Sequence, residues 1–579
     1  MDFPTQPGVL LEKMAIGSDE EGRCMKNFLG LVMVLGAVGC GSGSDSVNLS
    51  SNAVGSAGSG VSASADEARV EFVRQSHVVA RGEDRLALMI DGQAVFLQGA
   101  GGPNRDRPAG GLTPFSSPYS YMNDLVAAGA NCVRTYGTSF VFDDAQTQAQ
   151  DVAAAFSFAA RARRSKPIYV LVGLFMTKQT DKGTGAKGNG VDYSNPAQVS
   201  EQEALLLQVV DQVLLLDQSV QVGWCVGNEV LADDPQVQQK IWQSTDRIAV
   251  AIQAKSKLPV MTAHPTVTVA RLQEMNTAMP HLDWLGINNY AGVFSNQPPE
   301  SGGFLWQLPA TMEQAEASGA WDKPWVVSEF GSYDLPGRNI PALGPYTLEA
   351  NSTTNAANYA NSFSQYIAGA QSRNAHCVGG LVLNWMQPID SEMPAFFLDM
   401  YAFRGQPNSR PFEAVWNNAL ADRLQCTDAL AALWGGSISA DPCPQIVVTD
   451  GDNQGIACSF KATESNLNPT PVAQGANLTA SLTATDNGPV TVDWYLVGGQ
   501  VSHNLNQAGR QNPQDYGSTS IYLGSGQSAS NAGQTLNTIT FTPPTTTGNV
   551  YQLRAIVRDN TGSATTSGGA ATAAIVFRT

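Results

Sequence analysis

The chain has 579 residues, enough for roughly two to four domains. Only 14% of the residues are charged and the net charge is −17, which argues against nucleic-acid binding because that function needs a basic stripe. Eight cysteines are too few for a disulfide-based scaffold.

The N-terminal region contains a targeting segment. Residues 25–40, MKNFLGLVMVLGAVGC, have a basic start, an apolar run and small residues up to Cys40, which predicts a secretory signal too short to span a membrane. The Ala37-Val38-Gly39-Cys40 stretch resembles a bacterial lipoprotein cleavage box. A lipid on Cys40 would anchor the protein at the periplasmic face of a membrane or at the cell surface. An ordinary secretory signal is the alternative, and acids before residue 25 favour Met25 as the true start.

The next segments are a tether and a hairpin. Residues 41–66 are rich in Gly, Ser and Ala and predict a flexible linker. Two apolar runs, 85–90 and 93–99, flank Asp91-Gly92, which is a strong two-residue turn signal. We therefore expect a hairpin whose second arm leads into a larger sheet.

Strand-like and helix-like segments then alternate. The predicted strands are 95–99, 132–136, 168–174, 222–228, 259–263, 284–288, 325–329 and 380–385. The predicted helices are 117–129, 145–164, 199–217, 236–256, 267–278, 308–318 and 352–372. Eight apolar strands separated by helices predict a (β/α)₈ TIM barrel, with residues 67–436 as the catalytic domain. A doubly wound open sheet is disfavoured because no Gly-rich phosphate fingerprint follows an early strand.

Two acids close apolar strands in this pattern. Glu229 ends QVGWCVGNE, and Glu329 ends WVVSE one hundred residues later. Active groups of such barrels lie at the carboxyl ends of strands. Glycoside hydrolysis needs one carboxylic acid and one carboxylate across a sugar bond. Further polar or aromatic residues follow strands at this end: Arg134, Tyr136, Asn228, His264, Asn289, Tyr290 and Trp385. Local packing or ion pairing is the alternative role for each.

Several of these motifs carry a family resemblance. GWCVGNE, LGINNY, WVVSEFG and GGLVLNW resemble the strand ends of clan A glycoside hydrolases, which are retaining (β/α)₈ enzymes. DLVAAGANCVRTYG and WDKPWVVSEFGSYD are similar to bacterial proteins with a family 2 catalytic barrel, and GNEV, GINNY and SEFG to family 72 β-1,3-glucanosyltransferases. The resemblance covers roughly residues 85–420. It does not include the jelly-roll-like domain that precedes the barrel in family 2 galactosidases.

The resemblance implies roles for individual residues. Glu229 matches the acid/base, Asn228 the residue that holds the sugar 2-hydroxyl, and Glu329 the nucleophile. Arg134 and Tyr290 match groups that hydrogen-bond the nucleophile, and Trp385 matches the floor of the sugar site; His264 and Asn289 are further substrate-binding candidates. The chemistry is consistent: a cation favours an ionised nucleophile, and a less polar setting keeps an acid protonated.

Other chemistries lack support in the sequence. The five histidines do not show metal-ligand spacing, and no G-x-S-x-G elbow follows a strand, so no cofactor and no metal are expected. Long loops at 331–350 and 386–410 predict substrate recognition. The candidate outer sugar subsites are Tyr333, Phe397, Tyr401 and Trp306, with packing between loops as an equal alternative.

The cysteines fall into two groups. Cys132 and Cys225 lie in separate barrel strands and are expected to be buried free thiols. Cys443 is expected to form a disulfide with Cys426 or Cys458, although sequence alone does not determine the pairing.

Residues 437–579 have a different character. Short alternating strands at 477–484, 490–497, 537–543, 551–559 and 571–577 are separated by turn-rich spacers and predict an immunoglobulin-like β-sandwich. Trp494 is expected in its core. A structural spacer is favoured over a glycan-binding role for this domain.

Together these features predict a retaining glycoside hydrolase that acts on the O-glycosidic bonds of a β-linked oligo- or polysaccharide through a glycosyl-enzyme intermediate. In that case the two carboxyl groups should lie about 5–5.5 Å apart. A β-glucan transglycosylase using the same site is one alternative, and a catalytically silent glycan-binding surface lipoprotein is another.

Overall fold

A computed structural model gives the fold. It describes residues 69–76, 84–101, 121–136, 145–163, 166–177, 190–265, 267–289, 305–331, 335–340, 344–348, 351–373, 376–383, 385, 401–403, 421–448, 455–460, 472–473, 475–498, 521–531, 533–543, 550–562 and 568–578. The predicted signal segment, Cys40 and the tether lie outside these residues, so the lipoprotein assignment stays a prediction. Within the described residues, no helix is long and apolar enough to cross a membrane.

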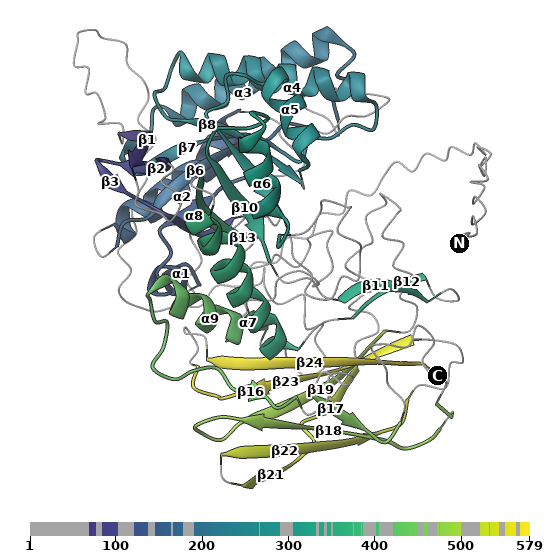
Figure 1. Cartoon of the computed structure of the whole chain (residues 1–579). Helices are drawn as coiled ribbons and strands as arrows, with labels where there is room; N and C mark the ends of the chain where they lie inside the picture. The colour runs from purple at the N-terminus through teal and green to yellow at the C-terminus, as the bar shows by residue number, and fades with distance from the viewer. Residues whose placement is uncertain are drawn as a thin grey trace, which may run out of the picture. The chain divides into compact units, whose positions relative to one another are not determined.

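The first large unit is a closed eight-stranded parallel barrel, which confirms the predicted TIM barrel (Figure 1). Its strands are β4 (Leu97–Gly101), β5 (Cys132–Arg134), β6 (Tyr169–Leu174), β7 (Gln221–Asn228), β8 (Val260–Pro265), β9 (Trp284–Asn288), β10 (Trp325–Phe330) and β13 (Cys377–Leu383). They follow one another around the barrel in chain order, and β13 pairs with β4 to close it. Nearly every residue of these strands is buried, because one face fills the barrel and the other packs on helices.

One predicted strand begins earlier than expected. The interval 380–385 was predicted, whereas β13 begins at Cys377 and includes Gly379 and Gly380. Glycines normally weaken a strand, but here they permit close packing. A Cβ atom on Gly379 would lie 2.3 Å from the carbonyl oxygen of Leu97 in the neighbouring strand.

Helices connect the strands and cover the outside of the barrel. They are α1 (Tyr121–Ala127), α2 (Ala145–Ala162), α3 (Pro196–Val213), α4 (Pro235–Gln253), α5 (Val269–Ala278), α6 (Leu308–Ala317), α7 (Ser352–Asn361) and α8 (Gly369–Arg373), with a π-helical segment Ser362–Ala368 between the last two. Each predicted helix has a counterpart. Asn195 and Asp234 start α3 and α4 by accepting backbone N–H groups, and a proline follows each of them.

A small antiparallel sheet packs at the end of the barrel where the strands begin. It contains β1 (Val70–Ser76), β2 (Asp84–Ile90) and β3 (Gln93–Ala94), in that order. The predicted turn is present, and Asp91 and Gly92 have φ values of 49° and 77°. The strand β1 was not predicted. Its Phe72 ring contacts Trp284, the first residue of β9, with ring centroids 5.6 Å apart, so this sheet covers the amino ends of the strands.

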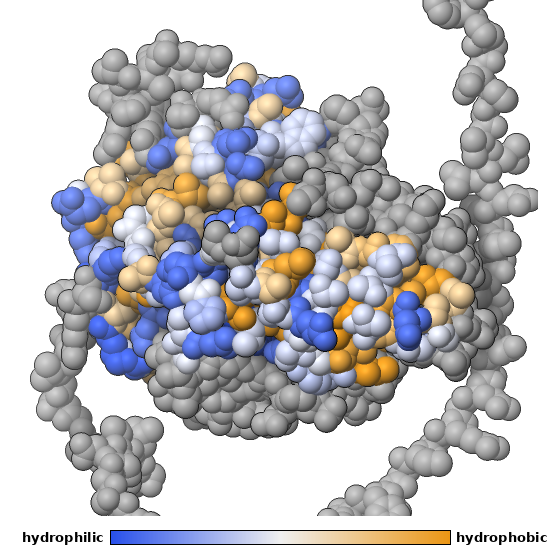
Figure 2. Space-filling view, turned by 90° about the horizontal axis from the view of Figure 1, so that it is seen from below, coloured by the Kyte–Doolittle hydropathy of each residue, from blue (hydrophilic) through white to orange (hydrophobic). Residues whose placement is uncertain are grey.

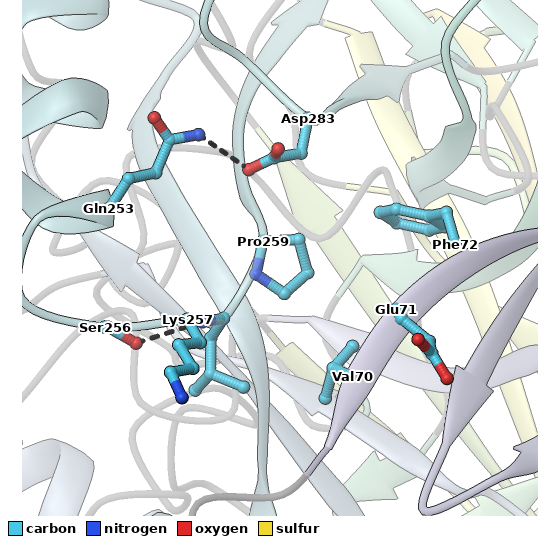
Figure 3. A pocket seen from close by; sticks show the side chains of 9 residues that line it. Val70, Glu71, Phe72, Gln253, Ser256, Lys257, Pro259 and Asp283 are labelled. Atoms are coloured by element: carbon cyan, nitrogen blue, oxygen red, sulfur yellow. Dashed lines mark hydrogen bonds between the residues drawn. The ribbon is translucent and has the colours of Figure 1, made fainter.

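A hollow of about 270 Å³ lies at this same amino end, between β1 and the segment that joins α4 to β8 (Figure 3). Its polar side chains are already used within the protein. Asp283 accepts hydrogen bonds from the Gln253 side chain and the Val260 N–H, and Ser256 accepts the Leu258 N–H. The hollow is therefore part of the packing of the barrel floor, at the opposite end from the strand-end acids.

The C-terminal part is a β-sandwich, which confirms that part of the predicted fold. One sheet has the order β14-β15-β24-β23-β19-β20 and the other β16-β18-β22-β21, with β17 also paired to β18. The strands are β14 (Tyr401–Phe403), β15 (Ala421–Leu424), β16 (Gln445–Ile446), β17 (Ile456–Cys458), β18 (Leu478–Thr485), β19 (Thr491–Gly498), β20 (Ile521–Gly524), β21 (Gln527–Asn531), β22 (Gln534–Phe541), β23 (Val550–Arg558) and β24 (Gly569–Arg578). A separate hairpin pairs β11 (Leu335–Ile340) with β12 (Gly344–Leu348).

The first sheet includes strands that precede residue 437. β15 pairs with β24 in parallel, and α9 (Gln425–Trp434) follows β15 directly. The carbonyl of Trp434 in α9 accepts a hydrogen bond from Gln98 in β4. The segment 421–434 thus belongs to the sandwich sheet through β15 and contacts the barrel through α9.

The predicted disulfide is wrong. Cys426, Cys443 and Cys458 are all free thiols in the structure. They belong to different surroundings: Cys426 packs in the barrel core cluster, Cys458 packs against the sandwich core, and Cys443 donates to the Arg423 carbonyl. Cys132 and Cys225 are buried free thiols, as predicted. Burial raises the pKa of Cys132 to about 12.

The face of the molecule seen in Figure 2 mixes polar and apolar side chains. Among the described residues, the most exposed large hydrophobic residue is Leu215, just after α3, at 78%. Others, such as Val250 in α4 and Leu536 in β22, belong to different elements. Isolated exposed hydrophobic residues are ordinary on protein surfaces, so these residues give no reason to infer a partner.

Trp494 is in the sandwich core, as predicted. It is fully buried and its indole N–H donates to Oδ1 of Asn537 at 2.6 Å. We expect Trp494→Phe to lower the free energy of local opening by about 1–3 kcal/mol, because a buried acceptor loses its donor. Faster deuterium uptake in β19 and β22 would show this. Leu536→Ala, at a 45% exposed position, serves as the control, and equal uptake in both variants would contradict the prediction.

Candidate active site

The two predicted acids lie at the same end of the barrel. Glu229 directly follows β7, and Glu329 lies near the carboxyl end of β10. Glu329 is almost fully buried, with 3% of its surface exposed. Because parallel barrel strands end on one face, both carboxyl groups reach the mouth opposite the β1–β3 sheet.

The end of β7 departs from regular strand geometry. Gly227 and Glu229 have φ values of 75° and 52°, and the register with β8 shifts between Cys225 and Asn228. In a regular strand, neighbouring side chains point to opposite faces. Here the irregular backbone lets both Asn228 and Glu229 accept hydrogen bonds from the same side chain, Asn288. Such outliers often occur at functional sites.

The end of β10 has a similar irregularity. The register of β10 shifts against both neighbouring strands close to Glu329. As a result, the adjacent residues Ser328 and Glu329 both contact the same group, the guanidinium of Arg134: Ser328 through its carbonyl and Glu329 through its carboxylate. The Glu329 carbonyl also accepts the Asn289 N–H at 2.9 Å.

Arg134, the last residue of β5, is the central cation of this end of the barrel. It is fully buried. Its Nη1 lies 3.5 Å from Oε1 of Glu329, and its Nη2 donates to Oδ1 of Asn228 at 2.7 Å. Its other contacts are with the Tyr136 hydroxyl, Oδ1 of Asn288, the Ser328 carbonyl and Sγ of Cys225.

The surroundings of Arg134 keep its guanidinium charged. Burial by itself would lower the pKa of Arg134, but Tyr136, Cys225 and Glu329 together raise it. The guanidinium carbon also lies 4.2 Å from the centre of the Tyr136 ring, a favourable cation–π position. A permanently charged group therefore lies against Glu329.

Asn288 is a site residue that was not predicted from the sequence. This residue ends β9 and is 1% exposed. Its Nδ2 donates to Oε1 of Glu229 at 2.8 Å, and its Oδ1 accepts from Arg134, which in turn contacts Glu329. The side chain of Asn288 thus contacts Glu229 directly, and it is connected to Glu329 through the guanidinium of Arg134. Its pairing with Glu329 is visible only in the strand register of the structure, so no sequence signal pointed to it.

The remaining predicted residues have separate environments. His264, in β8, is 7% exposed, and its Nδ1 lies 2.5 Å from the Pro265 carbonyl oxygen. Asn289 is buried, and its Oδ1 has no hydrogen-bond partner among the described residues. Trp385 is fully buried, and its ring packs against Trp434 with centroids 6.2 Å apart. Tyr290 lies outside the described residues.

Two of the four loop candidates lie among the described residues. Tyr333 and Phe397 lie outside the described residues. The backbone of Tyr401 pairs with Arg423 in the sandwich sheet. Trp306 is 42% exposed just before α6. Within the described ranges, no group of three or more His, Cys, Asp or Glu side chains lies close enough to hold a metal ion.

Gly227 is required by the geometry at the end of β7. Its φ of 75° disfavours any side chain, and a Cβ atom would lie 3.2 Å from Met176 and Val230. We expect Gly227→Ala to lower kcat/KM by about tenfold or more, because small displacements of reacting groups are costly. The measurement is kcat/KM on any glycoside that a substrate panel shows the wild type to cleave, with thermal unfolding recorded in parallel.

Gly319→Ala is the matched control for this change. Gly319 has a similar φ of 71°, but it follows α6 and a Cβ atom there would meet nothing within 4 Å. Equal loss of activity in both variants would mean that the effect is general backbone strain, with no specific link to the site.

No protein-family model and no curated protein matches the sequence. A Bacteroides uniformis β-glucuronidase 2 structure aligns at 12% identity and a TM-score of 0.40, covering 86% of this chain and 48% of the other. A Ruminococcus gnavus β-glucuronidase aligns at 13% identity and a TM-score of 0.34, covering 54% and 46%. The chain thus spans about half the length of these enzymes, and at such scores the likeness adds nothing to the strand topology described above.

Proposed function

We propose that this protein is a retaining glycoside hydrolase that cleaves β-linked glycans. The observation that carries the proposal is the pair of acids at one barrel mouth. Glu229 and Glu329 are joined through Asn288 and Arg134, and their settings differ. Glu329 lies against a buried cation, whereas Glu229 receives a neutral amide donor. Two carboxyl groups in unlike surroundings suit an acid and a nucleophile.

The mechanism follows from these positions. Glu329, which lies beside the Arg134 guanidinium, attacks the anomeric carbon while Glu229 donates a proton to the leaving oxygen. A covalent glycosyl-Glu329 ester forms and the leaving alcohol departs. Glu229, now a carboxylate, then removes a proton from water, and the hydroxide oxygen displaces Glu329 from the sugar. The resemblance of GNE and SEFG to clan A enzymes supports the same assignment.

The experiment is a substrate panel. Wild type and Glu329→Ala are assayed on β-1,3-, β-1,4- and β-1,6-glucans, mannans, and aryl β-galactosides, β-glucosides and β-glucuronides. We expect at least one substrate to be cleaved by the wild type alone, with a product whose first-formed anomer, followed by NMR, keeps the β configuration. An inverted first product would contradict the retaining mechanism. Products longer than the substrate would identify transfer to a second sugar.

The silent glycan-binding alternative is distinguished by the same panel. If neither protein turns over any substrate and both still bind glycan, the chain is a binding protein and the proposal is wrong. A folding check by circular dichroism on each variant removes misfolding as an explanation.

A further inference from the structure

We propose that Ser328 is a positioning residue that fixes the side-chain amide of Asn288 and through it the acid/base Glu229. The inference rests on the proposed function, because it assigns a role within the same site. Ser328 immediately precedes Glu329 in β10 and is fully buried. Its hydroxyl donates to Oδ1 of Asn288 at 2.7 Å.

The contacts of Asn288 determine which way its amide points. A guanidinium can only donate hydrogen bonds, so the amide atom that faces Arg134 must be the oxygen. The NH₂ group then faces Oδ1 of Asn228 and Oε1 of Glu229, at 3.0 and 2.8 Å. If the amide were reversed, its oxygen would lie against two other acceptor oxygens, and one donor to Glu229 would be lost.

The distances indicate that Ser328 is the stronger of the two groups that fix this orientation. The Ser328 hydroxyl lies 2.7 Å from Oδ1 of Asn288, whereas Nη1 of Arg134 lies 3.4 Å from it. Hydrogen bonds weaken as they lengthen beyond about 3 Å. Arg134 is also shared among several acceptors, while Asn288 Oδ1 is the acceptor for the Ser328 hydroxyl.

The neighbouring strand provides the space for this contact. Gly286 lies in β9, two residues before Asn288. A Cβ atom on Gly286 would lie only 2.7 Å from the Ser328 hydroxyl oxygen. The absence of a side chain at 286 therefore permits the Ser328 hydroxyl to occupy this position beside β9, where it reaches Asn288.

The experiment is a leaving-group comparison in a double-mutant cycle. Ser328→Ala, Asn288→Ala and the double variant are assayed on phenyl and 2,4-dinitrophenyl β-glycosides of the sugar that the wild type cleaves. Dinitrophenolate leaves without a proton, whereas phenolate needs the acid. We expect Ser328→Ala to lower kcat/KM about tenfold on the phenyl glycoside, the effect of one hydrogen bond, and much less on the dinitrophenyl glycoside.

In the Asn288→Ala background, Ser328→Ala should change kcat/KM by less than about twofold, because its partner is already absent. Ser244→Ala is the matched control. Ser244 is equally buried, but its hydroxyl donates to Glu203 between α4 and α3. If Ser328→Ala fails to fold, Ser328→Cys retains the shape with a weaker donor, and the same split between substrates is expected.

The outcomes separate the two proposals. Equal losses on both glycosides, or equal losses in both backgrounds, would give Ser328 a purely structural role and overturn the inference while the proposed function stands. A wild type inactive on every substrate would overturn both.

Discussion

Replacing Glu329 with glutamine is expected to lower kcat/KM by about 10⁴-fold or more, because the proposed nucleophile is lost while its shape is kept. The wild type should also become labelled by a 2,4-dinitrophenyl 2-deoxy-2-fluoro-β-glycoside, since the fluorine slows breakdown of the ester formed at Glu329. Intact-mass measurement and peptide mapping should place this label on Glu329, and Glu329→Gln should remain unlabelled.

The control for this variant is Glu274→Gln. Glu274 is an exposed glutamate in α5 that pairs with Arg271 on the surface. Its substitution should leave both activity and labelling unchanged. A label on a residue other than Glu329, or an active Glu329→Gln protein, would remove the proposed nucleophile and with it the double-displacement mechanism.

Glu229→Ala should show a different pattern, because the role proposed for the Glu229 carboxyl group is to donate and accept protons. We expect kcat/KM to fall by about 10²–10⁴-fold on a phenyl glycoside, the usual contribution of general acid catalysis, and much less on a dinitrophenyl glycoside. The second step should then become slow, because water lacks its base. Steady-state kinetics with a pre-steady-state burst measurement would separate the two steps.

Added azide provides the decisive control for Glu229. Azide is an anion and attacks the glycosyl ester without a base, so it should restore turnover of the dinitrophenyl substrate in Glu229→Ala and yield a β-glycosyl azide. It should not do so in Glu329→Gln. If azide fails to restore turnover in Glu229→Ala, the acid/base role assigned to Glu229 is removed. If Glu229→Ala gives an α-glycosyl azide, the roles assigned to Glu229 and Glu329 are reversed.

The residues that were predicted are marked by a short stretch of sequence, whereas the residue that was missed is marked only by its contacts with other strands. Glu229 and Glu329 could be found because each follows an apolar run of strand length. Asn288 could not, because its importance depends on side chains from three other parts of the barrel: Arg134 in β5, Glu229 just after β7 and Ser328 in β10. The motif GINNY drew attention to Asn289 and Tyr290, although Asn288 is the residue that contacts both Arg134 and Glu229.

The same contrast applies to the fold. The strands of the barrel were predictable. Strand β1 was missed, because what defines it is the hydrogen bonding of its backbone to β2, a strand that comes later in the chain. The disulfide of Cys443 with Cys426 or Cys458 was predicted from cysteines that are near in sequence, whereas all three are free thiols and the Cys443 thiol donates to the Arg423 carbonyl. Proximity along the chain was a poor guide because a domain junction lies among these residues.

By itself, the sequence determined the barrel, the sandwich and the two acids, since hydrophobic periodicity and strand-end position are properties of short segments. Only the tertiary structure decided how the acids are connected. The left-handed backbone at Glu229, the shifted registers of β7 and β10, and the contacts of Ser328 and Arg134 with Asn288 all depend on neighbouring strands. Their register is set by packing around the whole barrel, and no short segment encodes it.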